Sequence, residues 1–231
     1  PGTLWRQLLT VTQRALQSGV LQPIPTDFLY LDDGGIRFLV RLVRHLARKP
    51  RPSSAESPQA APRRNPFLPY DPELYVADAS SQHVCLLNKF NVVEHHLLIV
   101  TRTFEEQETL LTRQDFESLF RCLAEYEGLG FYNSGMVAGA SQPHKHLQLV
   151  PLPLDPAGPA LPIAPAIDSA EVTADVRSLD ALLFPHAIVA LEAGGADMVI
   201  IETMTAIEAA IAAVKAAKNH TRLLVVASFT F

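Results

Sequence analysis

The sequence contains few cysteines, no excess of positive charge and no long apolar run. Cys85 and Cys122 are isolated within or beside apolar runs, which is typical of buried thiols in a reducing compartment and not of a disulfide framework or a zinc site. The formal net charge of −5 argues against a broad basic surface for nucleic acid, although it leaves room for a pocket with a few cations. No run of about 18 apolar residues occurs, and the first residues do not resemble a secretion signal. We therefore expect a cytoplasmic protein that binds neither nucleic acid nor membranes.

The length and the apolar content predict one sizeable domain with a core of its own. The chain has 231 residues, of which 48% are hydrophobic. Apolar spacing predicts an N-terminal helix over residues 4–19, and alternation after a turn at 32–35 predicts a strand beginning at Ile36. Residues 49–64 are rich in proline, serine and alanine, so we expect residues 51–63 to form a mobile surface loop.

The pattern sharpens after residue 65 and indicates strands on both sides of an amphipathic helix. Residues 84–87 and 96–100 are short apolar runs whose spacing suits an antiparallel pair. Residues 103–127 have an acidic amphipathic pattern that predicts a helix, with Asp115 near the start of its main part, and the glycines that follow are expected to end it. Two further strands, from Phe131 and over 143–151, are expected to flank a loop of small residues.

The residues that carry chemistry lie in the segment NSGMVAGASQPHKHLQ, from Asn133 to Gln148. Side chains alternate along a strand, so His144, His146 and Gln148 should share one face while the intervening leucine points to the other. The glycines and Ser141 before them would let the backbone approach a phosphate closely and donate N–H groups to it. The segment therefore predicts a phosphate-binding loop beside a ladder of polar side chains.

Nucleophilic catalysis is the function that this arrangement favours. A neutral imidazole is a good nucleophile at phosphorus when its other nitrogen is held by an acceptor that fixes the tautomer. A bare His-x-His pair would suit an unrelated metal site or a polar surface instead. The loop of small residues at this spacing favours phosphate chemistry over both alternatives.

This segment resembles the signature of the histidine-triad superfamily. The matching positions are Asn133, Gly135, Ala138, Gly139, His144 and His146. Gln148 replaces the third histidine, and His-x-His-x-Gln is the pattern of the transferase branch of that superfamily. The resemblance implies an α+β fold with a mostly antiparallel sheet and helices. It also implies that His146 is the nucleophile, that Gln148 holds an oxygen of the attacked phosphate, and that His144 is a third catalytic residue.

Other segments are similar to the ATP adenylyltransferase family, the diadenosine tetraphosphate phosphorylases, over about residues 5–190. These segments are LQSGVLQPI, DDGGIRFLVR, NPFLPYDPELYVAD and LLNKFNVVEHHLLIVTRTFEEQ. The likeness implies phosphorolysis of diadenosine tetraphosphate to ATP and ADP, and the reverse transfer, through an adenylyl-histidine. The binding partners would be diadenosine polyphosphates, ATP, ADP and phosphate. No metal or cofactor of the protein's own is implied, and magnesium would arrive with the nucleotide.

The same likeness assigns substrate-binding roles to a set of residues. They are Asn88, His96, Asn133, Gly139, Ser141, Gln142 and Lys49. Asn88 corresponds to a ribose-binding position, and Lys49 corresponds to a lysine suited to the polyphosphate. Simpler alternatives stay open, with Asn88 as a turn residue and His96 as a histidine that only packs. Lys89 fits an exposed turn lysine better than a phosphate ligand, and His83 has no supporting group in the sequence.

The composition and the predicted secondary structure change from about residue 194. The segment GADMVIIETM resembles a strand of a homocysteine S-methyltransferase barrel, and the tail predicts one βαβ unit, with strands at 198–201 and 223–228 and a helix at 206–217. One unit cannot build a site that a barrel assembles from several strands. We therefore expect a shortened histidine-triad-like nucleotidyltransferase domain over 1–190 and a tail over 194–231 that covers an open edge or face of it.

Three other functions stay open from the sequence. A dinucleoside polyphosphate hydrolase of the same superfamily would use water as the acceptor, but Gln148 in place of the third histidine argues against it. A catalytically impaired nucleotide-binding protein is compatible with the whole motif, because the expected domain is shortened and joined to a different tail. A homocysteine-binding module in the tail would depend on Glu202.

Overall fold

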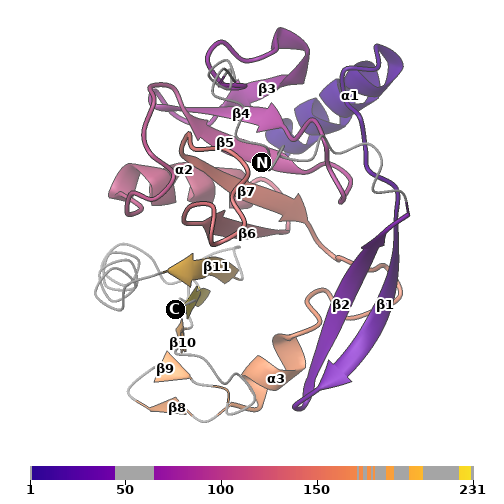
Figure 1. Cartoon of the computed structure of the whole chain (residues 1–231), viewed down its shortest axis with the longest axis vertical. Helices are drawn as coiled ribbons and strands as arrows, with labels where there is room; N and C mark the ends of the chain where they lie inside the picture. The colour runs from indigo at the N-terminus through magenta and orange to yellow at the C-terminus, as the bar shows by residue number, and fades with distance from the viewer. Residues whose placement is uncertain are drawn as a thin grey trace, which may run out of the picture.

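The computed structural model describes residues 2–44, 65–170, 172–173, 176–177, 179, 186–189, 198–204 and 224–229. Three expectations fall outside these residues: the mobile loop at 51–63, the role of Lys49, and the helix at 206–217. Within the described residues, the chain forms an α+β fold in which one long sheet carries two helices on one face (Figure 1).

One long sheet runs through the molecule. Its strands in spatial order are β3 (Tyr75–Asp78), β4 (His83–Leu87), β5 (Leu97–Thr101), β7 (His146–Pro151), β6 (Gly128–Asn133), β11 (Met198–Met204), β12 (Leu224–Phe229), β10 (His186–Val189), β9 (Val176–Arg177) and β8 (Val172–Thr173). Neighbouring strands are antiparallel except around β11, which runs parallel to both β6 and β12. The α+β class with a mostly antiparallel sheet is therefore confirmed, as is the pairing of the two apolar runs that form β4 and β5.

Shorter units flank this sheet. β1 (Thr26–Asp33) and β2 (Ile36–Val43) form a separate antiparallel hairpin, which extends away from the first half of the long sheet (Figure 1). The strand expected from Ile36 is thus present directly after the expected turn. A 3-10 turn, η2 (Pro72–Leu74), leads into β3, and the short helix α3 (Ala164–Asp168) follows β7.

Two helices cover the same face of the sheet. α1 (Thr3–Gln17) confirms the predicted N-terminal helix, and its buried apolar residues recur on one side. They share one core with α2 (Arg113–Leu123) and with inward-facing strand residues such as Cys85, Ile99 and Leu147. No helix among the described residues combines the length and the apolar character needed to cross a membrane. The two helices do not cover the opposite face of β4, β5 and β7.

The acidic helix expected over residues 103–127 is shorter than predicted. A capping box starts α2, because the Thr112 hydroxyl accepts a hydrogen bond from the backbone N–H of Asp115 while the Asp115 carboxylate accepts one from the backbone of Thr112. Residues 104–111 form a loop before this cap, and backbone groups of the loop bond to the segment that precedes β7. These long-range hydrogen bonds replace the helical ones, so the amphipathic pattern overstates the length of the helix.

The glycines expected to end that helix are the first residues of β6. A Cβ atom on Gly130 would lie 2.9 Å from Cδ1 of Leu119, and one on Gly128 would lie 2.8 Å from Cδ1 of Leu149. The prediction of a helix stop and of a strand starting only at Phe131 is therefore wrong. Close packing of α2 and β7 against β6 leaves little room for a side chain at these two positions.

The tail strands lie within the long sheet. β11 pairs in parallel with β6, from Val199 opposite Gly130 to Glu202 opposite Asn133, and β12 lies on the other side of β11. Both strands occupy the expected positions, and β11 lies along the edge of β6 that faces away from β7. The boundary expected between residues 190 and 194 falls between β10 and β11, two strands of this one sheet.

Candidate active site

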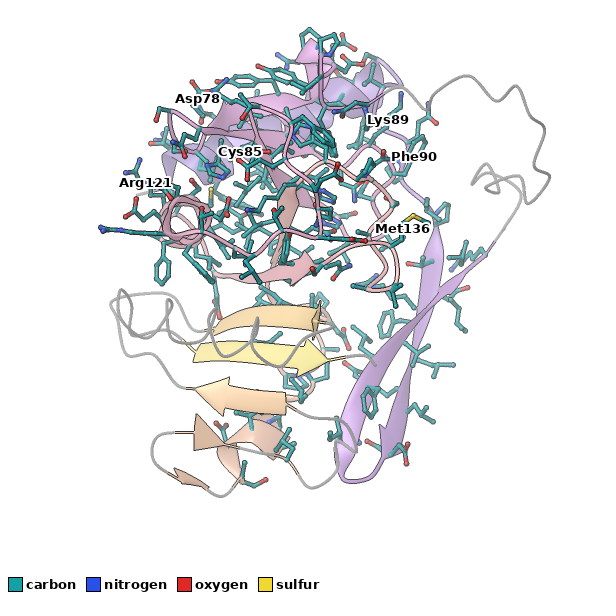
Figure 2. The ribbon with its side chains drawn as sticks, turned by 60° about the vertical axis from the view of Figure 1, so that its left-hand side comes forward. Asp78, Cys85, Lys89, Phe90, Arg121 and Met136 are labelled. Atoms are coloured by element: carbon teal, nitrogen blue, oxygen red, sulfur yellow. The ribbon has the colours of Figure 1, made fainter. Side chains whose placement is uncertain are left out.

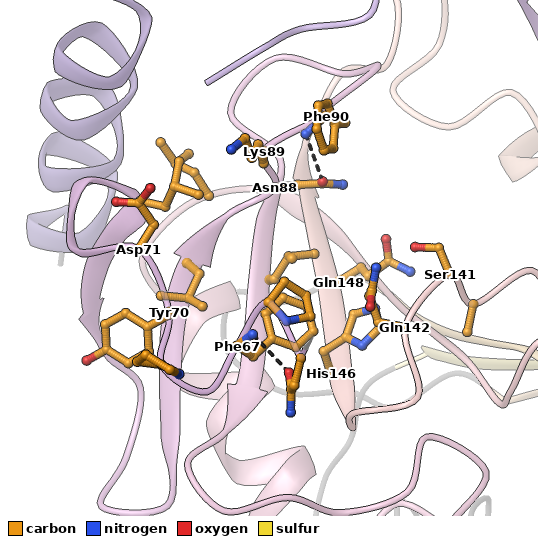
Figure 3. A pocket seen from close by; sticks show the side chains of 18 of the residues that line it. Phe67, Tyr70, Asp71, Asn88, Lys89, Phe90, Ser141, Gln142, His146 and Gln148 are labelled. Atoms are coloured by element: carbon orange, nitrogen blue, oxygen red, sulfur yellow. Dashed lines mark hydrogen bonds between the residues drawn. The ribbon is translucent and has the colours of Figure 1, made fainter. Parts of the chain in front are cut away.

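A cavity of about 760 Å³ lies against the face of the sheet opposite α1 and α2 (Figure 3). Its lining comes from four segments that are far apart in the sequence. They are the stretch 65–74 before β3, residues 86–90 together with Leu98, the loop after β6 with Asn133 and residues 139–142, and His146 with Gln148 of β7. The segments that the sequence analysis joined into one site therefore meet at one cavity.

The expected alternation along β7 holds from His146 onward. Leu147 and Leu149 are fully buried in the core beneath the helices, whereas His146 and Gln148 line the cavity. The neighbouring strand continues this face, because Leu98 of β5 lies opposite Gln148 in the register and lines the cavity with it. The cavity floor is thus built by two paired strands.

The ring of His146 is held in one tautomer. Its Nδ1 lies 2.8 Å from the backbone carbonyl oxygen of His144, and a carbonyl can only accept, so Nδ1 carries the proton. Nε2 therefore keeps its lone pair. Burial lowers the pKa of His146, which favours the neutral ring over the imidazolium. The histidine that lines the cavity thus has the protonation state that a nucleophile at phosphorus needs.

Asn88, His96 and Gln148 form a polar group beside His146. The Asn88 amide lines the cavity, and its Nδ2 lies 3.3 Å from Nδ1 of His96. Burial lowers the pKa of His96 to about 4, against the opposing effect of the neighbouring Gln148 side chain. The Nε2 atom of His96 has no hydrogen-bond partner among the described residues. His96 is therefore a neutral, buried histidine behind the cavity wall, whereas Asn88 and Gln148 face the cavity itself.

His144 differs from the position that simple alternation predicts. It precedes β7, forms an isolated bridge with Glu106, and is fully buried outside the cavity lining. Its Nε2 donates to the carbonyl oxygen of Thr101 at 2.8 Å, and its Nδ1 accepts from the Asn65 amide at 2.9 Å. Both ring nitrogens are occupied, so what His144 offers to His146 is its backbone carbonyl.

The loop after β6 has the backbone that the sequence analysis expected of a phosphate site. Gly135 and Gly139 have φ angles of 88° and 91°, in the left-handed region that favours glycine. A side chain on Gly135 would also meet the Glu108 side chain at 2.6 Å. Ser141 and Gln142 line the cavity next to Gly139. These residues and His146 therefore surround the same space (Figure 3).

Sequence reasoning missed the wall formed by residues 65–74. Phe67 lines the cavity and places its ring 5.4 Å from the ring of His146, and Tyr70 lies further along the same wall (Figure 3). The segment served only as a family marker in the sequence. Its density of aromatic and proline residues is a signal that could have indicated a binding wall. Lys89, expected to be an exposed turn lysine, also lines the cavity.

A charged cluster lies on the other side of the same strand segment. Lys145 is fully buried, and its Nζ lies 2.7 Å from Asp115 and 3.3 Å from Glu105. Asp115 also accepts from Nε2 of His83 at 2.8 Å. Burial opposes ionisation, yet the hydrogen bonds from His83 and Lys145 lower the pKa of Asp115 to about 2. His83, which has no supporting group in the sequence, thus belongs to a network that anchors the segment carrying His146.

The chain is similar to known proteins in sequence and in fold. Residues 1–169 match the family model described as the Ap4A phosphorylase N-terminal domain. Diadenosine 5',5'''-P1,P4-tetraphosphate phosphorylase 2 of Saccharomyces cerevisiae is 34% identical over 131 residues, covering 51% of this chain and 39% of that protein. The chain therefore spans about two fifths of the length of this curated relative.

Solved structures of yeast Ap4A phosphorylase Apa2 have a similar fold. The complex of Apa2 with AMP superposes with a TM-score of 0.65 and 26% identity, over 82% of this chain and 63% of that chain. The complex with Ap4A gives a TM-score of 0.68 and 25% identity, over 83% and 66% of the two chains. The family match over residues 1–169 includes the strands and loops that build the cavity.

Proposed function

Because this chain belongs to the Ap4A phosphorylase N-terminal domain family, we propose that it transfers an adenylyl group from diadenosine tetraphosphate to inorganic phosphate, giving ATP and ADP. The observation that carries the proposal is the state of His146, a neutral imidazole at the cavity with its Nδ1–H bound to a backbone carbonyl. The names of the similar yeast proteins, and the Ap4A and AMP complexes of Apa2, support the choice of substrate.

In the first step, the Nε2 lone pair of His146 attacks an α-phosphorus of the dinucleotide. A nitrogen–phosphorus bond forms, the bond from that phosphorus to the bridging oxygen breaks, and ATP leaves with the bonding electrons. The ring becomes positively charged as the bond forms, and the carbonyl of His144 that accepts from Nδ1 stabilises that charge. His144 therefore acts through its backbone.

In the second step, an oxygen of inorganic phosphate attacks the same phosphorus. ADP forms, the nitrogen–phosphorus bond breaks, and His146 regains its lone pair. Gln148 faces the cavity two residues beyond the nucleophile, where its amide can donate to a non-bridging oxygen of the adenylyl phosphate in both steps. Backbone N–H groups of the glycine loop, with Ser141 and Gln142, would bind the remaining phosphates.

The rest of the cavity suits a nucleoside. We assign the ribose to Asn88 and Asn133, two residues of the cavity lining, and the base to the apolar wall that includes Phe67. Lys89 contributes a cation at the same cavity, and the assignment of Lys49 to the polyphosphate remains part of the proposal. Magnesium would enter bound to the polyphosphate, as part of the substrate, and offset its charge.

We place this activity in the cytoplasm. Cys85 and Cys122 lie with their sulfur atoms 3.6 Å apart and are free thiols. Buried neighbouring thiols of this kind are typical of proteins from reducing compartments, where disulfides are rare. Intracellular nucleotides would then be the available substrates.

Incubation of the intact chain with diadenosine tetraphosphate, with and without inorganic phosphate, tests the proposal. Chromatography should show equal amounts of ATP and ADP that form only when phosphate is present. ATP and AMP formed without phosphate would identify a hydrolase. Absence of any product, together with calorimetric binding of AMP, would identify a nucleotide-binding protein without transferase activity.

A further inference from the structure

The pairing of β6 with β7 stops just where the cavity begins. The register runs from Gly128 opposite Pro151 to Phe131 opposite Gln148. If it continued, Asn133 would stand directly opposite His146, because each step adds one residue on one strand and removes one on the other. Both of these residues line the cavity, yet the two strands are not paired there.

The side-chain amide of Gln107 lies between these two residues. The backbone N–H of His146 donates to Oε1 of Gln107 at 2.8 Å, and Nε2 of Gln107 donates to the carbonyl oxygen of Asn133 at 2.7 Å. The same Nε2 lies 3.2 Å from the carbonyl oxygen of His146. The amide thus bridges the N–H of His146 and the carbonyl oxygen of Asn133, which would otherwise bond to each other directly. It separates the two strands by the width of one amide group.

Gln107 is itself fixed from several directions. Only 1% of its surface is exposed. Its backbone N–H donates to the carbonyl oxygen of Pro143 at 2.7 Å, and its carbonyl oxygen accepts from the buried hydroxyl of Tyr132. Every polar group of the residue therefore has a partner, so the amide can transmit the position of its own loop to His146.

We propose that Gln107 is a positioning residue that separates β6 from β7 at the cavity and holds the backbone of His146 in place for the transfer reaction. This inference rests on the proposed function. Without the amide, the strands could pair for one more step, which would move Asn133 toward His146 and shift the start of the glycine loop. A displacement of about 1 Å at a reacting group costs roughly a hundredfold in rate.

The first test compares Gln107→Met with Thr109→Val. Methionine keeps the length of the side chain but neither donates nor accepts at this site. Thr109 lies in the same loop and bonds locally to the Glu106 carbonyl at 2.7 Å, without contacting His146. We expect kcat of Gln107→Met to fall by roughly a hundredfold with little change in KM, because the geometry of the reacting group is altered. Thr109→Val should keep the wild-type kcat. Equal losses in both variants, or a wild-type kcat in Gln107→Met, would overturn the proposal.

The second test uses Gln107→Glu and its pH profile. A carboxylate at this position still accepts from the N–H of His146 but cannot donate to the carbonyl of Asn133. When protonated, the acid regains one donor. The kcat of this variant relative to wild type should therefore rise as the pH falls. A kcat ratio that does not change with pH would show that donation to the carbonyl of Asn133 is not needed for the reaction. This test does not depend on whether Gln107→Met folds.

Amide hydrogen exchange separates this inference from the proposed function. The N–H of His146 should lose protection in Gln107→Met or Gln107→Glu, whereas the N–H of Gln148, whose pairing with Phe131 does not involve Gln107, should keep it. If the wild-type chain shows no phosphorolysis, the proposed function fails, and this measurement still decides the contact. Unchanged protection of the His146 N–H, or an equal loss of protection at His146 and Gln148, would contradict the positioning role of Gln107.

Discussion

The two faces of the segment from His144 to Gln148 bury polar groups in opposite ways. On the cavity face, the ring of His146 donates to a backbone carbonyl, and burial lowers its pKa. On the opposite face, Lys145 is fully buried as a cation, and Asp115 lies 2.7 Å from its Nζ. Burial keeps His146 neutral despite the carbonyl that accepts from its ring, whereas Lys145 lies against two carboxylates.

The difference assigns separate tasks to the two faces. A nucleophile needs a lone pair, so a face without charged partners suits His146. An anchor gains from full charges with short contacts, since a buried cation is tolerated only when it is compensated. The single-residue alternation of an extended chain is enough to place both tasks side by side.

Removal of the nucleophile should give the largest effect and tests the cavity face. We expect His146→Ala to lower kcat/KM for phosphorolysis by roughly three orders of magnitude or more, because the variant lacks the group that forms the covalent intermediate. His146→Gly should regain part of the rate when free imidazole is added. Rates measured by product chromatography, with and without imidazole, provide the check.

His144→Ala is the matched control for that result. Its ring bonds to Thr101 and Asn65 while its backbone carbonyl holds His146, so the variant should keep more activity than His146→Ala. If His144 proved indispensable while His146→Ala retained transfer, the roles of the two histidines would be reversed. His146 would then not be the residue that defines the cavity face in the comparison with Lys145.

Removal of the buried cation should give the next largest effect and tests the opposite face. Lys145→Met removes the cation that compensates Asp115 and Glu105, so the free energy of unfolding should fall by about 3–5 kcal/mol. Urea denaturation followed by fluorescence measures this change. The double variant Lys145→Met with Asp115→Asn removes both charges and should recover part of the loss. A loss below about 1 kcal/mol in the single variant would show that the cluster behaves like a surface pair.

Local pattern was sufficient for some parts of the fold and the site. Alternation placed Leu147 in the core and His146 at the cavity, and the apolar runs of β4 and β5 were recognised as a pair. The phosphate loop was recognised from its small residues, and Gly135 and Gly139 have positive φ angles in the structure. These features depend on neighbours in the sequence, which is why the sequence reveals them.

Features that depend on distant partners could not be predicted in this way. Gln107 was placed in a long helix, because nothing local shows that its amide bonds to Asn133 and His146. His83 gained its role only through contact with Asp115, 32 positions away along the chain. The aromatic wall at 65–74 likewise needed the folded chain to bring it to the cavity.

Acidification should lower the free energy of unfolding by a smaller amount, and the two faces should respond in different pH ranges. The pKa of His96 falls from an ordinary 6.5 to about 4 in the folded chain, so the unfolded chain takes up the proton first as the pH drops. Stability is then fully present above pH 6.5 and is lost as the pH falls toward 4. His96 alone would account for up to about 3 kcal/mol of this loss. Asp115, with a pKa of about 2, contributes stability that is lost only below about pH 4.

Urea denaturation in steps from pH 7 to pH 4 measures this dependence. In His96→Gln the fall in the free energy of unfolding across that window should be smaller than in wild type, because the group that titrates is gone. A profile identical to that of wild type would show that buried histidines on the cavity side do not control the acid response. The two faces would then not differ in the pH range over which they lose stability.

The smallest effect is expected where the same kind of ion pair lies in solvent. Arg113 and Glu117 of α2 form an i, i+4 pair with a nitrogen–oxygen distance of 2.6 Å, and their side chains are 64% and 46% exposed. Water solvates both groups after either partner is removed, so Arg113→Ala should change the free energy of unfolding by less than about 0.5 kcal/mol. The denaturation used for Lys145→Met provides the comparison, and Glu117→Ala with the double variant completes a cycle. A coupling energy above about 1 kcal/mol would mean that burial is not what makes Lys145 costly to remove, because an exposed pair would then matter as much.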